Sequence, residues 1–234
     1  MADGYVVLDS LTEWLSTPAT VANELTGVDF RLEVDCALVD YTNNNRQILV
    51  AKYMWDANNT KHWQFYCQYN NLNLDVFDGA SGGAIGNYTV VLSGVLTDGA
   101  RYKLRVDLDI NVGGTQSTAK FYYSTNGIDY TQIGTDQTIE NTVTLNAVNN
   151  ATVTIGATGT GEEGAATGTF YRARGWSGFG VTPVFDGNLN DYVSGSSWTS
   201  VTTGETWTVN GSPEIHAPTG GGTPINIALA VGGS

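Results

Sequence analysis

A strictly alternating segment, 101–110, constrains the fold of this chain more than any other feature. Apolar side chains occupy every second position and charged side chains lie between them. The apolar set is Tyr102, Leu104, Val106, Leu108 and Ile110, and the charged set is Lys103, Arg105, Asp107 and Asp109. A period of two places the two sets on opposite faces of a β-strand. The segment therefore predicts an antiparallel sheet with one buried face and one face in water.

The segment that follows predicts a β-hairpin. Two β-rich arms, Lys120–Ser124 and Tyr130–Ile133, flank a short polar loop that contains Asn126 and Gly127. Asn-Gly between apolar runs is a strong hairpin signal, because both residues tolerate the positive φ of a tight turn. We expect this hairpin to continue the sheet of the alternating segment.

Short strand-like segments separated by turn residues continue along the chain, and no segment has the helical period. The further predicted strands are Tyr5–Leu8, Phe30–Asp40, Ile48–Tyr53, His62–Tyr69, Leu72–Phe77, Tyr88–Leu96, Thr142–Val148, Thr152–Gly156, Thr169–Trp176, Phe179–Val184 and two short strands within Asp191–Val209. We expect Trp14–Asn23, which Pro18 interrupts, to form a loop or an irregular edge. The pattern predicts an all-β fold: an antiparallel sandwich, jelly roll or barrel.

The charge balance excludes some classes of partner. The chain has 234 residues and a net charge of −13, from 23 acidic and 10 basic side chains. Binding to nucleic acid or to anionic membranes needs clusters of Lys and Arg, so we expect neither partner. No apolar run approaches the roughly 20 residues of a membrane span. The first ten residues contain no secretory signal, which predicts synthesis in a cytoplasm.

The two cysteines, Cys36 and Cys67, each share the phase of apolar neighbours on a predicted strand. We expect buried free thiols, with a disulfide as the alternative. Two cysteines alone do not form a metal site.

Several stretches together resemble the concanavalin A-like, laminin-G-type jelly rolls of tailed-bacteriophage virion proteins. The stretches are Gly4–Leu8, Trp14–Pro18, Phe30–Asp40, Arg101–Asp109, Phe121–Gly134, Phe170–Trp176 and Glu205–Gly211. The resemblance covers roughly residues 4 to 211 and implies one jelly-roll domain, 1–211. It also implies a virion protein, either a capsid decoration or a minor tail protein, that is assembled in the host cytoplasm. The lack of a signal peptide agrees with that implication.

After Gly211 the composition changes to a Pro- and Gly-rich stretch. We interpret 212–234 as a flexible arm that ends in an apolar docking peptide. The docking side chains would be Ile225, Ile227, Leu229 and Val231. Such a peptide can add to the exposed sheet edge of a partner. A strand that returns to its own sandwich, or a frayed terminus, is the alternative.

Since relatives of this fold include glycoside hydrolases, a pair of carboxylates is a candidate catalytic site. Glu33 and Asp35 share one face of a strand and resemble part of the Glu-x-Asp-x-x-Glu signature of laminarinase-type hydrolases, but Leu38 occupies the third acidic position. We therefore interpret the two acids as solvated surface charge and predict no catalytic residues.

Sugar binding would use an exposed aromatic side chain beside Asn or Asp. Trp55, next to Asp56 and Asn58, is the preferred site, and further candidate aromatics are Trp63, Tyr66, Trp176 and Trp198. Laminin-G-type domains often bind Ca²⁺, and Asp56, Asn58, Asp75 and Asp78 could donate oxygens. Their spacing matches no calcium motif, so we predict no metal or cofactor.

These observations lead to a non-enzymatic virion structural protein of a tailed phage, capsid decoration or tail-associated, that assembles through its C-terminal arm. Its partners would be other virion proteins, including further copies of itself in a homo-oligomer. The alternative is a carbohydrate-binding adhesin for host-surface glycans.

Overall fold

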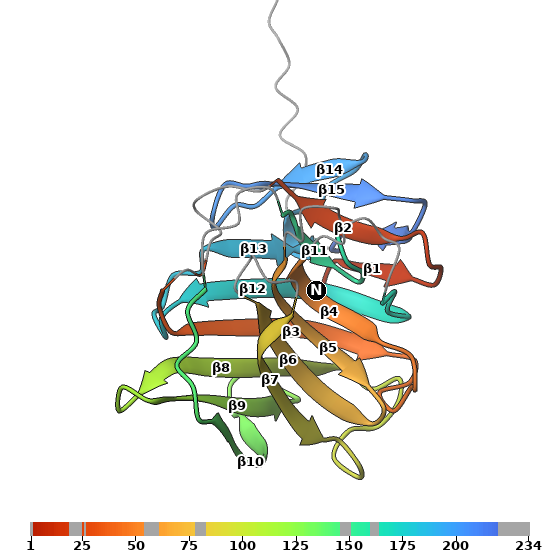
Figure 1. The fold of residues 1–234 in the computed structure, drawn as a ribbon. Helices are drawn as coiled ribbons and strands as arrows, with labels where there is room; N and C mark the ends of the chain where they lie inside the picture. Colours follow the sequence, from red (N-terminus) through yellow and green to blue (C-terminus); the bar gives the residue numbers. More distant parts are fainter. Residues whose placement is uncertain are drawn as a thin grey trace, which may run out of the picture.

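The computed structural model describes residues 2–18, 25, 27–53, 61–77, 83–145, 151–159 and 164–219. Within these residues two eight-stranded sheets lie face to face (Figure 1). Neighbouring strands pair antiparallel throughout, which confirms the predicted antiparallel β-sandwich. Among the described residues, Leu189–Asp191 form a three-residue 3-10 helix, and none of these residues belongs to a helix long and apolar enough to cross a membrane.

Sheet 1 contains the alternating segment and the hairpin that the sequence predicts. In spatial order its strands are β10 (Thr131–Ile139), β9 (Gln116–Ser124), β8 (Tyr102–Val112), β3 (Phe30–Leu38), β12 (Gly168–Ser177), β1 (Tyr5–Leu8) and β16 (Glu214–His216), and β13 (Phe185–Asn188) also pairs with β12. Sheet 2 covers its inner face. In spatial order the strands of sheet 2 are β14 (Ser197–Thr199), β15 (Thr206–Asn210), β2 (Trp14–Thr17), β11 (Val153–Ile155), β4 (Gln47–Tyr53), β5 (Lys61–Gln68), β6 (Asn71–Phe77) and β7 (Ala84–Val91).

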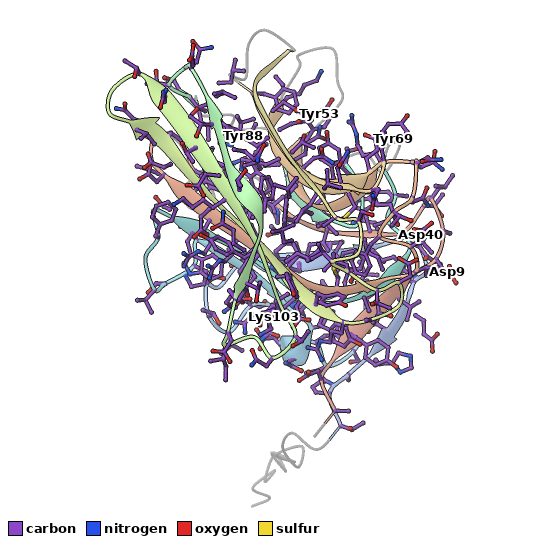
Figure 2. All side chains as sticks on the ribbon, turned by 90° about the horizontal axis from the view of Figure 1, so that it is seen from below. Asp9, Asp40, Tyr53, Tyr69, Tyr88 and Lys103 are labelled. Atoms are coloured by element: carbon purple, nitrogen blue, oxygen red, sulfur yellow. The ribbon has the colours of Figure 1, made fainter. Side chains whose placement is uncertain are left out.

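The core lies between the sheets, where side chains from both inner faces interdigitate (Figure 2). In β8 the apolar set of the alternating segment is buried and the charged set is half-buried, as the period of two predicts. Cys36 and Cys67 are fully buried free thiols, as expected. Burial raises the pKa of both thiols well above the usual value.

Four strand predictions need correction. The strand predicted at Tyr88–Leu96 is β7, which runs from Ala84 to Val91, and residues 92–96 lie outside it in a turn. Residues 14–17 form strand β2, because Leu15 is fully buried and the strand pairs with both β11 and β15. Residues 142–145 form no strand, and 146–148 lie outside the described residues. Residues 179–184 form an exposed loop instead of a strand, and the strand begins at Phe185. Pro183 cannot donate to a strand ladder, which explains the delayed start.

Candidate functional site

The outer face of sheet 1 carries charges that match across neighbouring strands. The cross-strand partners in the β3–β8 ladder are Arg31 and Asp107, Glu33 and Arg105, and Asp35 and Lys103. Opposite charges at directly opposed positions contribute about 0.2–1 kcal/mol each to a sheet. Two of these opposed pairs, Arg31–Asp107 and Lys103–Asp35, are ion pairs, whereas Arg105 pairs with Asp107 of its own strand.

Glu33 and Asp35 are covered by neighbouring side chains and are only 6% and 5% exposed. Glu33 accepts hydrogen bonds from the Tyr130 hydroxyl at 2.5 Å and from Arg174. Asp35 accepts two bonds from the guanidinium of Arg101, at 2.7 and 2.8 Å. The expectation of solvated acids is wrong, because arginine side chains replace the water around both groups. Both carboxylates are therefore engaged by side-chain donors of the protein itself.

Arg101 joins three segments that are far apart in the sequence. Besides its paired bonds to Asp35, it donates to Asp3 at 2.7 Å and stacks on the ring of Tyr171, whose centroid is 3.6 Å away. The hydrogen bond with Asp35 raises the pKa of Arg101, and the hydrogen bond from Arg101 lowers the pKa of Asp3. A guanidinium fixed by two carboxylates and a ring presents its charge in one orientation.

The loop between β9 and β10 is the turn that the sequence predicts. The side-chain oxygen of Asn126 accepts from the backbone N–H groups of Ile128 and Asp129, both at 2.9 Å. The backbone N–H of Gly127 donates to the Ser124 hydroxyl at 2.8 Å. Gly127 has a φ of +73°, which glycine adopts without strain. Asn126 and Gly127 therefore hold the loop beside β8 in one conformation.

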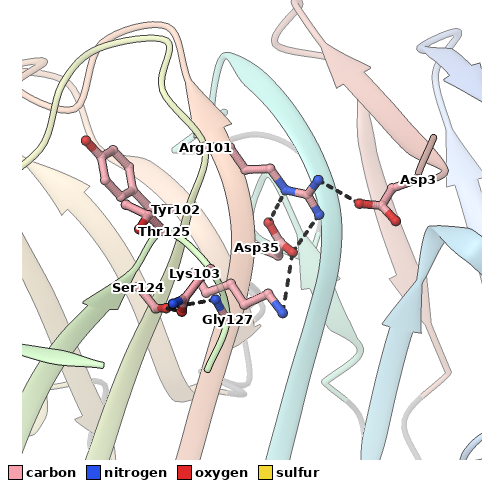
Figure 3. A pocket seen from close by; sticks show the side chains of 9 residues that line it. Asp3, Asp35, Arg101, Tyr102, Lys103, Ser124, Thr125 and Gly127 are labelled. Atoms are coloured by element: carbon pink, nitrogen blue, oxygen red, sulfur yellow. Dashed lines mark hydrogen bonds and ion pairs between the residues drawn. The ribbon is translucent and has the colours of Figure 1, made fainter. Parts of the chain in front are cut away.

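A pocket of about 260 Å³ lies between this loop and Arg101 (Figure 3). We call it the hairpin pocket; its lining residues are Asp3, Asp35, Arg101, Tyr102, Lys103, Ser124, Thr125, Asn126 and Gly127. Lys103 Nζ lies 4.0 Å from a carboxylate oxygen of Asp35. Thr125 is exposed, and its hydroxyl has no hydrogen-bond partner within the described residues. Lys103 and Thr125 are therefore available to a ligand.

The pocket is charge-balanced. Its lining contains two cations, Arg101 and Lys103, and two carboxylates, Asp3 and Asp35. A simple anion would approach the two carboxylates, and a simple cation would approach the two cations, so neither is favoured. A hydroxyl group both donates and accepts, and so it can use cationic donors and carboxylate acceptors together. The arrangement suits a neutral ligand with several hydroxyl groups.

The structure brings together a different set of residues from the one that we predicted. Trp55, Asp56 and Asn58 lie outside the described residues, as do Ile225, Ile227, Leu229 and Val231. Of the other candidate aromatics, Trp63 is fully buried and Tyr66, Trp176 and Trp198 are at most 6% exposed. These four side chains belong to packed surfaces and offer no open ring for a sugar.

Of the four candidate calcium ligands, the structure describes Asp75 and not the other three. Asp56, Asn58 and Asp78 lie outside the described residues. Asp75 is 6% exposed and accepts hydrogen bonds from Gln64 at 2.7 Å, from Tyr66 at 3.0 Å and from Asn87. Within the described part of the chain, no group of three or more His, Cys, Asp or Glu side chains could hold a metal ion.

Sequence reasoning missed the hairpin pocket, although it had identified parts of it. It assigned Lys103 to the polar face of a strand and found the turn at Asn126 and Gly127. No local signal links Asp3 to Arg101, because the two residues are 98 positions apart. The four charged side chains on the polar face of 101–110 were the available sign that this face pairs with charged side chains of other strands.

Comparison with known proteins finds similarity in fold to solved structures. No protein-family model matches the chain, and no curated protein sequence matches it. A solved structure of a mutant of NanB sialidase from Streptococcus pneumoniae is similar, with a TM-score of 0.52 and 13% identity over 76% of this chain. The match spans 27% of that sialidase chain, about a quarter of its length.

Two further structures give weaker matches. A SAP-like pentraxin from Limulus polyphemus has a TM-score of 0.48 and 14% identity, over 75% of this chain and 76% of the pentraxin. The CBM40 of Ruminococcus gnavus IT-sialidase, bound to α2,3-sialyllactose, has a TM-score of 0.47 and 10% identity, over 70% of this chain and 85% of that one. At these identities the likeness concerns the jelly-roll sandwich fold alone.

Proposed function

We propose that this chain is a non-enzymatic glycan-binding domain whose binding site is the hairpin pocket. The observation that carries the proposal is the balance of two cations and two carboxylates around one small recess. Sugar hydroxyls can bond to both kinds of group, whereas a charged ligand would meet an unfavourable partner. The site differs from the Trp55 loop that the sequence favoured, but the class of ligand is the same.

The rigidity of the pocket supports this proposal. Arg101 is held by Asp3, Asp35 and Tyr171, and the opposite wall is the hydrogen-bonded Asn126 loop. A site that is ordered before binding loses less entropy when the ligand arrives. The paired state of Glu33 and Asp35 supports binding without hydrolysis.

The test is binding of the full chain to a glycan array, followed by calorimetric titration with the best neutral glycan. Lys103→Met should reduce the affinity by roughly tenfold or more, the loss of one hydrogen bond to a charged group. Thr125→Val should reduce it by a smaller factor. Thr135→Val, an exposed threonine in β10 outside the pocket, is the matched control and should bind normally. An array without any binding would refute the proposal.

A second proposal concerns assembly of the domain on a phage particle through residues 220–234. The sequence placed the start of the arm at 212, but Glu214–His216 form β16, which pairs with β1 and so belongs to sheet 1. It rests on the apolar sequence of Ile225–Val231 and on the position of Thr219, which bridges Ala2 beside β1 at one edge of sheet 1. A peptide that continues from a sheet edge is well placed to meet a neighbouring subunit. Removing residues 220–234 should leave a folded domain that is not incorporated into particles. Normal incorporation, measured by immunogold electron microscopy, would contradict this proposal.

A further inference from the structure

A second recess lies on the same outer face of sheet 1, toward the other end of β8. Its volume is about 250 Å³, and its lining residues are Asp107, Asp109, Thr118, Lys120, Tyr122 and Phe179. We call it the Phe179 pocket. None of its lining residues belongs to the hairpin pocket, so the face carries two separate recesses.

A continuous row of cross-strand pairs connects the two pockets. The outward-facing partners in the β8–β9 ladder are Lys103 and Ser124, Arg105 and Tyr122, Asp107 and Lys120, and Asp109 and Thr118. We call these eight residues the β8–β9 strip. The first pair lines the hairpin pocket, and the last two pairs line the Phe179 pocket. With a rise of about 3.3 Å per residue, Lys103 and Asp109 are roughly 20 Å apart.

The middle of the strip is stiff and partly aromatic. The guanidinium carbon of Arg105 lies 4.4 Å from the ring centroid of Tyr122 and 4.1 Å from that of Tyr130. The Tyr130 hydroxyl is in turn fixed by its bond to Glu33. Burial and this bond raise the pKa of Tyr130, so the hydroxyl stays protonated and remains a donor. A ligand crossing the strip would therefore meet a preformed floor.

The far pocket adds an aromatic ring that is much more exposed than Tyr102 in the hairpin pocket. Phe179 is 47% exposed, and its ring lies 5.7 Å from the guanidinium of Arg31. The loop that carries Phe179 is held by a hydrogen bond from the Trp176 ring nitrogen to the backbone oxygen of Val181, at 3.2 Å. An open aromatic ring beside polar groups suits a sugar ring, which has an apolar C–H face and polar edges.

We infer that the β8–β9 strip and its two pockets form one extended surface that binds a chain of neutral sugars instead of a single sugar. This inference rests on the proposed glycan-binding function. The hairpin pocket would hold one part of the chain by hydrogen bonds, and Phe179 would stack on a sugar farther along it. Linking two contacts in one ligand raises affinity because the second contact forms within the complex.

The experiment is calorimetric titration of the full chain with neutral oligosaccharides of increasing length, taken from the series that the array identifies. Affinity should rise with length until the chain spans both pockets. Phe179→Ala should then lower the affinity for the longest chain by roughly two- to tenfold, the range for one aromatic contact. Its effect on the shortest bound sugar should be negligible. Lys103→Met should weaken binding at every length.

Val181→Ala is the matched control, because Val181 lies in the same loop, is 96% exposed and lines neither pocket. It should leave all affinities unchanged. Affinity that does not change with length, with Phe179→Ala without effect and Lys103→Met still damaging, would overturn the extended surface and leave the proposed function standing. Failure of every sugar to bind would overturn both.

Discussion

The substitution Gly127→Ala adds one methyl group beside the hairpin pocket, and Gly99→Ala is its matched control. Both glycines have a φ of +73°. A Cβ at Gly99 would meet no atom within 4 Å. A Cβ at Gly127 would overlap Lys103 Nζ and would lie 2.8 Å from Lys103 Cε. The two alanine variants therefore share one backbone penalty and differ in their effect on the pocket.

The shared penalty follows from the left-handed backbone. An L-residue in this conformation costs about 1–2 kcal/mol relative to glycine. We expect Gly127→Ala and Gly99→Ala each to lower the free energy of unfolding by about that amount. For a chain of this size the melting temperature should fall by roughly 2–8 °C. Urea denaturation and calorimetry measure the two quantities.

The difference between the variants should appear in binding. The end of the Lys103 side chain is flexible and can move away from a new methyl group, so the clash should add little to the stability loss. Its ammonium group would leave the pocket, however, and glycan affinity should fall roughly tenfold or more in Gly127→Ala. Gly99→Ala should bind as the original chain does. Equal affinities of the two variants would refute the role given to Lys103.

Three further outcomes are expected. Cys36 and Cys67, fully buried and with raised pKa values, should not react with a thiol reagent until the chain is unfolded. Burial raises the pKa of Tyr88 to about 12, against about 10 in an unfolded chain. The stability that the buried, protonated Tyr88 contributes should therefore be complete below about pH 10 and lost as the pH rises toward 12. Absorbance titration combined with denaturation tests this. Glu33→Gln should lower the free energy of unfolding by about 1–3 kcal/mol and leave binding of the shortest sugar, which uses the hairpin pocket alone, intact. Glu140→Gln, at an exposed position, should change neither, and loss of a sugar-releasing activity in Glu33→Gln would instead indicate a hydrolase.

The local part of the structure could be predicted from the sequence. Alternation over 101–110 identified which side chains of β8 are buried, and Asn126 with Gly127 identified the turn of the hairpin. Both signals depend only on neighbours in the chain. The error at 14–17 has the same origin in reverse: Pro18 interrupts the stretch 14–23 in the sequence, but pairing with β11 and β15 makes residues 14–17 a strand.

The pocket could not be predicted, because its contacts are non-local. Arg101 pairs with Asp35 across 66 positions and with Asp3 across 98 positions. Glu33 and Arg174 are 141 positions apart. A charged residue on the polar phase of a strand looks the same in sequence whether it faces water or an opposite charge. The outcome depends on strand order, here β8 beside β3 and β3 beside β12, which the strand pattern left open.

Strand order also determines how charge is distributed over the molecule. Seven of the ten basic side chains form ion pairs on sheet 1 with six carboxylates; the cations are Arg31, Arg101, Lys103, Arg105, Lys120, Arg172 and Arg174. Since the chain has 10 basic and 23 acidic side chains, three cations and seventeen acids lie outside these ion pairs, and one of those acids, Asp109, is on the same face of sheet 1. The ion-paired set on sheet 1 is thus close to neutral, at +1, and the side chains outside it carry −14, which together give the net charge of −13. Long-range attraction of charged partners would act on that acidic remainder. A ligand recognised on sheet 1 must be selected by short-range hydrogen bonds and stacking, and its affinity should therefore change little with salt.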